Sequence, residues 1–169
     1  MMRPHEKFRE EHVAVAYLIT FRTYGTWLHG TRGSVDRFHN TYGRPKLPPD
    51  KARWEYNRKL LIQAPVTLAG RQRVIVEQAI REICEARRWS LQAVNVRTNH
   101  IHTVVTALCK PEKVLNAFKA NATRKLRAAK YWHNQRSPWA RHGSTRYLWT
   151  EEQVLNAIAY VLYDQGKPL

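Results

Sequence analysis

The chain has 169 residues, of which 43% are hydrophobic, and its 29 Lys and Arg against 13 Asp and Glu give a formal net charge of +16. This length suits one domain with a sizeable core, and no apolar run is long enough to span a membrane. The positive net charge favours binding to a polyanion. Nucleic acid is a better candidate partner than an anionic membrane surface, because the N-terminus shows no basic amphipathic helix or lipidation signal.

The first predicted element is a strand over residues 13–21, a nearly continuous apolar run rich in β-formers that is typical of a buried central strand. The segment from about Gly25 to Pro65 holds four Gly and four Pro with little periodicity, which predicts a long functional loop with a short helix over 51–61. Its aromatic and basic residues combine stacking faces with cations, as single-strand binding requires.

A first amphipathic helix is expected after Ala69, where apolar residues recur at helical spacing. Residues 89–97 and 100–108 then read as two strands joined closely enough to form a hairpin. Pro111 marks the start of a second helix with an apolar stripe and a basic face, running to about residue 130. A short edge strand over 145–149 and a capping box at Thr150–Gln153 precede a final helix to Gly166.

This order of elements predicts an α+β sandwich in which helices cover one face of an antiparallel sheet. Residues 1–169 are expected to form a single domain, because no repeat or low-complexity tract divides them. Cys84 and Cys109 are too few for a disulfide framework and indicate reduced side chains in a cytoplasmic protein.

The most informative motif is Asn99-His100-Ile101-His102. Because side chains alternate along a strand, His100 and His102 project from one face and Ile101 from the other. Two imidazoles so placed form a bidentate metal site that lacks a third ligand. Taken alone, such a pair is more often ordinary polar alternation on a half-exposed strand.

On the final helix, Tyr160 and Asp164 are four residues apart and therefore share a face, so a phenol and a carboxylate point to one place. Taken alone, Tyr160 among apolar neighbours would be an amphipathic core tyrosine.

Together, the histidine strand and the late Tyr-x-x-x-Asp in a small basic protein resemble the HUH-type single-strand tyrosine transposases. The resemblance is greatest to the REP-associated tyrosine transposases and the insertion-sequence-200-like group. It covers most of the chain and implies a ferredoxin-like two-layer sandwich. It also implies that His100, His102 and Asp164, with Gln165 in reserve, hold Mg²⁺ or Mn²⁺ against a scissile DNA phosphate. Tyr160 is then the nucleophile, with Tyr163 as its reserve.

The implied reaction cleaves single-stranded DNA, leaves a 5′-phosphotyrosine and a free 3′ hydroxyl, and rejoins strands. The implied partners are hairpin-containing single-stranded DNA and, in a homodimer, a second copy of the chain. Basic and aromatic residues expected to contact nucleic acid are Arg22, Trp27, Arg32, Arg37, Arg44, Arg97, Lys119, Arg124, Arg127 and Arg146. The alternative is a non-catalytic protein that binds single-stranded or structured nucleic acid, in which the histidines and Tyr160 are structural.

Overall fold

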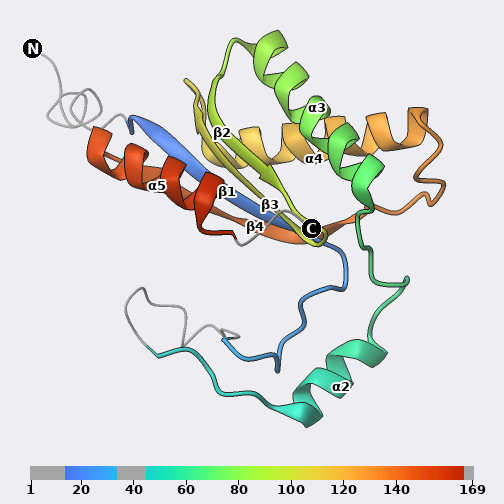
Figure 1. Cartoon of the computed structure of the whole chain (residues 1–169). Coiled ribbons are helices and arrows are strands. Elements are labelled where there is room, and N and C mark those ends of the chain that lie inside the picture. Colours follow the sequence, from blue (N-terminus) through green and yellow to red (C-terminus); the bar gives the residue numbers. More distant parts are fainter. Residues whose placement is uncertain (1–13, 34–44, 166–169) are drawn as a thin grey trace, which may run out of the picture.

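The computed structural model describes residues 14–33 and 45–165 and contains one four-stranded antiparallel sheet with helices on both of its faces (Figure 1). The sheet has the order β2-β3-β1-β4. In chain order, the elements are β1 (Ala16–Thr23), α2 (Lys51–Lys59), α3 (Gly70–Arg87), β2 (Ser90–Val96), β3 (His100–Thr106), α4 (Pro111–Ala128), β4 (Trp139–Leu148) and α5 (Glu151–Tyr163). The predicted α+β class, antiparallel sheet and β2–β3 hairpin are confirmed.

The main hydrophobic core lies between one face of the sheet and the helices α3 and α4. Tyr17, Ile19 and Phe21 alternate along β1 and point into this core, as the period of a strand requires. Helix α4 presents a buried apolar stripe that includes Phe118, which is fully buried. The sheet and the helices α3 and α4 are the two layers of the predicted sandwich.

The opposite face of the sheet is covered by α5 (Figure 1). Val154, Ala157 and Val161 of this helix pack on Ala16 of β1 and Val104 of β3. The prediction put the helices on one face; α3 and α4 follow it, and α5 lies on the other. The physical reason is that the central strands β1 and β3 carry apolar residues on both faces, so a helix must pack on each face to shield these residues from water.

Strand β4 begins at Trp139, earlier than the predicted start at residue 145. It is an edge strand, and most of its middle residues are exposed, so its sequence lacks the apolar alternation that marks a half-buried strand. A Cβ on Gly143 would lie 2.7 Å from the carbonyl oxygen of Thr20 and 3.0 Å from the Leu115 side chain. Glycine therefore allows β4 to pair closely with β1.

Between β1 and α3, the described part of the chain contains α2, which agrees with the short helix predicted over 51–61. Its N-cap is Asp50, whose side chain accepts a hydrogen bond from the Arg53 backbone nitrogen at 3.0 Å. Among the described helices, none is long and apolar enough to cross a membrane. Cys84 and Cys109 are both free.

Candidate active site

The two histidines of the motif lie side by side on β3, on the sheet face that α5 covers. Their ring centroids are 4.9 Å apart, and the His102 side chain is buried. The strand register places His102 opposite Thr20 of β1 and opposite Asn95 of β2, and it places His100 opposite Arg22. The predicted common face of the two imidazoles is therefore present.

The Nδ1 atom of each ring is held by a neighbouring side chain. His100 Nδ1 lies 2.6 Å from Asn99 Oδ1, and His102 Nδ1 lies 2.8 Å from Thr20 Oγ1. Because the Asn99 oxygen only accepts, His100 carries its proton on Nδ1 and keeps a lone pair on Nε2. The Thr20 hydroxyl can accept from His102 in the same way. Such partners orient the ligating histidines of metal sites.

Both imidazoles are held in the neutral form. Burial, followed by the charges of His100 and Arg22, lowers the pKa of His102 to about 4. The pKa of His100 is also lowered, mainly by burial and further by Arg22 and Arg97, although a hydrogen bond with Gln165 raises it in part. Neutral imidazole is the metal-binding form, so neither ring has to lose a proton at neutral pH before it binds a cation.

Helix α5 brings Tyr160 to the same place. The Tyr160 and His102 ring centroids are 5.5 Å apart, with an angle of 79° between the ring planes. Tyr160 is 41% exposed, so a substrate strand can reach it. The reserve nucleophile, Tyr163, is the last residue of α5 and is 78% exposed. The tyrosine packed against the histidines is therefore Tyr160.

The third side chain that meets the histidines is Gln165. Helix α5 ends at Tyr163, and Asp164 is its exposed C-cap, whose backbone nitrogen still donates to the Tyr160 carbonyl at 3.2 Å. Within residues 14–33 and 45–165, no three His, Cys, Asp or Glu side chains gather into a metal-binding group. By contrast, the Gln165 side chain lies close enough to both rings to raise the pKa of each, and its Nε2 donates to the Tyr160 carbonyl at 3.3 Å.

The donor set fits a divalent cation. Two imidazole nitrogens and one amide oxygen leave coordination positions open for a phosphate. A mixed nitrogen and oxygen set suits Mn²⁺ better than Mg²⁺, which prefers oxygen ligands throughout.

Several expected nucleic-acid contacts surround this site. Arg22 is exposed, its guanidinium lies 5.6 Å from the centroid of the Trp27 ring, and its charge interacts with Tyr160. Arg97 is buried near His100, whose pKa its charge lowers. Arg146 is exposed on β4 opposite Leu18, which packs under α5, so it shares the histidine face.

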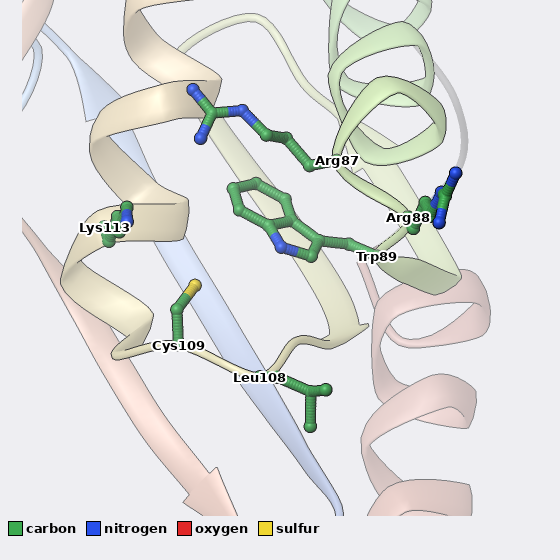
Figure 2. A pocket seen from close by; sticks show the side chains of 6 residues that line it. All are labelled: Arg87, Arg88, Trp89, Leu108, Cys109 and Lys113. Carbon is green, nitrogen blue, oxygen red and sulfur yellow. The ribbon is translucent and has the colours of Figure 1, made fainter.

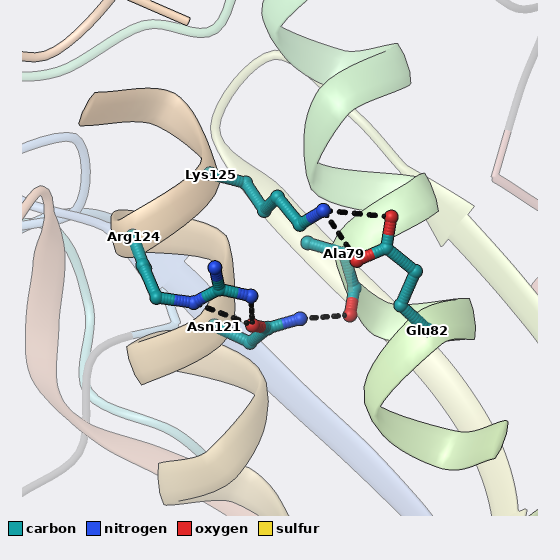
Figure 3. A network of polar contacts seen from close by, with 5 residues as sticks. All are labelled: Ala79, Glu82, Asn121, Arg124 and Lys125. Atoms are coloured by element: carbon teal, nitrogen blue, oxygen red, sulfur yellow. Dashed lines mark hydrogen bonds and ion pairs between the residues drawn. The ribbon is translucent and has the colours of Figure 1, made fainter. Parts of the chain in front are cut away.

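Three other expected contacts lie on α4, which packs on the opposite face of the sheet. The Lys119 ammonium donates to the carbonyl oxygens of Ala140 and His142 in β4, at 2.8 and 3.2 Å. Arg124 donates to Asn121 Oδ1 at 2.7 Å, within a network that ties α4 to α3 (Figure 3). Arg127 donates to two backbone carbonyls just beyond the helix. The structure does not bring these side chains to the histidines, because their donors serve contacts within the fold.

The remaining expected contacts are in the loop after β1. Arg32 is exposed there, and Arg37 and Arg44 lie outside the described residues.

Sequence reasoning did not identify Thr20 and Asn95, which the strand register places on either side of His102. No motif marks them, because their positions depend on how β1 and β2 pair with β3.

A hollow of about 280 Å³ lies at the other end of β3 (Figure 2). It is lined by Arg87, Arg88, Trp89, Leu108, Cys109 and Lys113. None of the candidate catalytic or metal-binding residues lines it.

A family model described as "Transposase IS200 like" matches residues 55–157. This range includes both histidines, covers more than half of the chain and ends before Tyr160.

Among solved structures, the chain is similar to a REP-associated tyrosine transposase bound to a REP hairpin, with a TM-score of 0.52 and 10% identity. That alignment covers 89% of this chain and 66% of the other, so the chain spans slightly less than two thirds of that relative. A second similar structure is a candidate transposase from Deinococcus radiodurans R1, with a TM-score of 0.49, 12% identity and coverage of 88% and 89%. No curated protein matches the chain in sequence. At 10% identity, the likeness to the REP-associated transposase structure establishes a shared fold. The family model, which matches more than half of the chain, establishes the relationship: this chain belongs to the IS200-like transposase family.

Proposed function

We propose that this protein is a metal-dependent transposase that cleaves and rejoins single-stranded DNA through a phosphotyrosine on Tyr160. The observation that carries the proposal is the packing of the Tyr160 ring against His102 within one chain, with centroids 5.5 Å apart. A pair of neutral imidazoles, His102 buried and His100 half-buried, beside a solvent-accessible phenol supports phosphoryl transfer to tyrosine.

His100, His102 and Gln165 are the residues that would hold the cation. When bound, a divalent cation withdraws charge from phosphorus and orients the phosphate for in-line attack. Within this set, the chain's own contribution is to keep both rings neutral and to fix their Nδ1 atoms through Asn99 and Thr20.

The Tyr160 oxygen forms the new bond to phosphorus, and the bond from phosphorus to the DNA 3′ oxygen breaks. The phenol loses its proton to solvent, and the departing 3′ oxygen gains one. The product is a phosphodiester between Tyr160 and the DNA 5′ end. Attack by a 3′ hydroxyl on this ester reverses the chemistry and joins strands.

Arg22 and Trp27 are the residues we assign to the DNA strand next to the reacting phosphate. The Arg22 guanidinium bears a charge beside Tyr160, and the half-buried Trp27 ring offers a surface on which a base can stack. Because the similar REP-associated transposase is bound to a hairpin, we propose hairpin-containing single-stranded DNA as the substrate. A homodimer remains a prediction.

The test is covalent capture of DNA. The substrate is a pool of hairpins with randomised single-stranded flanks, labelled at the 3′ end so that the protein-linked fragment keeps the label. With Mn²⁺, the protein should give a labelled band that survives denaturing electrophoresis. Tyr160→Phe should lose this band and still bind the pool, whereas the matched variant Tyr163→Phe should keep it. Binding without an adduct under Mg²⁺ and Mn²⁺ would favour the non-catalytic alternative.

A further inference from the structure

A side-chain hydrogen bond from Asn95 of β2 joins the last turn of α5 to the sheet. We propose that Asn95 is a positioning residue that holds Tyr160 and Gln165 in place against the paired histidines. This inference rests on the proposed function, because it assigns a task to a residue beside the proposed nucleophile.

Asn95 reaches α5 because of a register shift in β2. A β-bulge between Leu91 and Ala93 changes the face on which the following residues lie. Leu91 packs against the main core, whereas Ala93 packs under α5. Asn95 is two residues further along and therefore lies on the α5 face, directly opposite His102.

The Asn95 amide Nδ2 donates to the Val161 carbonyl at 2.9 Å. The regular helical partner of this carbonyl would be the backbone nitrogen of residue 165, which lies beyond the end of α5. Asn95 therefore satisfies a terminal carbonyl from the strand that pairs with the histidine strand. The preceding carbonyl, that of Tyr160, accepts from the Asp164 backbone nitrogen at 3.2 Å and from Gln165 Nε2 at 3.3 Å.

These bonds matter because, apart from the half-buried Ile158, the apolar side chains of α5 that pack on the sheet are small. Its buried residues are Val154, Ala157 and Val161, which fix the buried face of the helix but resist sliding along the sheet weakly. A directional hydrogen bond to the Val161 carbonyl also fixes the position of the preceding residue, Tyr160, along the helix axis. Displacement of a reacting group by about 1 Å can reduce a rate by about a hundredfold.

The experiment compares Asn95→Ala and Asn95→Leu with the unaltered protein. Both variants remove the donor, and Leu keeps the side-chain volume, so an effect shared by both belongs to the hydrogen bond. The matched control is Gln92→Ala, since Gln92 lies on the same strand but is hydrogen-bonded to Thr106 of β3 at 2.7 Å and not to α5. The probe is a single labelled hairpin chosen from those that the unaltered protein captures.

The proposal predicts a fall of about tenfold or more in the rate of adduct formation at saturating DNA, with the DNA Kd changed by less than about twofold. Amide hydrogen exchange in residues 160–164 should accelerate in both Asn95 variants and not in Gln92→Ala. Adduct formation at the unaltered rate in both variants, or a loss of rate matched by loss of DNA affinity, would overturn the proposal.

Failure of the proposed function gives a different result. In that case the unaltered protein forms no adduct with any hairpin in the pool, and amide exchange alone decides whether Asn95 holds the last turn of α5. Unchanged exchange in the Asn95 variants would then overturn the inference, and accelerated exchange would support it.

Discussion

Thr20→Val removes the side-chain contact that orients His102. Thr20 Oγ1 lies 2.8 Å from His102 Nδ1, and the two residues face each other across β1 and β3. Valine has nearly the same shape as threonine but neither donates nor accepts a hydrogen bond. The substitution therefore leaves the sheet pairing intact and deprives one buried ring nitrogen of its partner.

The size of the effect follows from the burial of His102, which is 6% exposed and leaves little room for water to replace the hydroxyl. An unsatisfied polar group of this kind costs about 1–3 kcal/mol of folding free energy. Loss of the partner that orients a metal-ligating histidine reduces metal affinity by about 10- to 100-fold. We therefore expect both a lower melting temperature and weaker Mn²⁺ binding in Thr20→Val.

The assay is Mn²⁺ titration of the DNA-free protein, followed by electron paramagnetic resonance, with thermal unfolding measured in parallel. The matched control is Thr103→Val, because Thr103 is fully buried on the opposite face of β3 and donates to the Ile19 carbonyl at 3.5 Å. It should lower stability and leave Mn²⁺ affinity unchanged. Equal Mn²⁺ affinity in Thr20→Val and the unaltered protein would refute the assignment of Thr20 as the partner of a metal ligand.

Three further predictions concern pH, the origin of the nucleophile and α4. In metal-free protein, the pKa of His102 is about 4 in the folded state and near its ordinary value of 6.5 in the unfolded state, so the free energy of unfolding should fall by roughly 3 kcal/mol as the pH drops from 7 to 4. Urea unfolding of His102→Gln should show a smaller loss over the same pH range. An equal loss would contradict the lowered pKa of His102. Because Tyr160 meets His102 of its own chain, mixing Tyr160→Phe with His102→Gln should not restore adduct formation, whereas restored adduct would show that the helix serves a partner chain. Lys119→Met should lower the melting temperature because it removes the hydrogen bonds from Lys119 to the β4 carbonyls. It should leave the salt dependence of DNA binding unchanged. A decrease of about one unit in the slope of log K against log salt concentration would show that Lys119 contacts a phosphate.

Most elements could be predicted from the sequence because their signals are local. The apolar run of β1, the helical spacing in α3 and α4, and the capping box of α5 each depend on residues close together in the chain. The early part of β4 has no such signal, since an exposed edge strand needs no apolar alternation. The position of α5 on the second face depends on the burial of both central strands, a property of the assembled sheet.

The candidate site divides in the same way. His100 and His102 share a face through simple alternation, so the sequence predicts their pairing. The choice between Asp164 and Gln165 depends on the path of the backbone just beyond α5, and sequence predicts the ends of helices poorly. The contacts of Thr20 and Asn95 require strand register and a bulge, neither of which a single sequence determines. The basic face of α4 resembles a phosphate-binding surface in sequence, but Lys119, Arg124 and Arg127 on it donate to backbone carbonyls and to the Asn121 side chain.

The central claim is that Tyr160 attacks a DNA phosphate under the control of the paired histidines. The most direct test is mass spectrometry of the protease-digested adduct formed with Mn²⁺ and a captured hairpin. The account predicts a 5′-phosphodeoxynucleotide on the peptide that contains Tyr160, with fragmentation placing it on that residue and no product from the His100→Gln, His102→Gln double variant. A nucleotide on Tyr163, or an adduct that persists without both histidines, would contradict it.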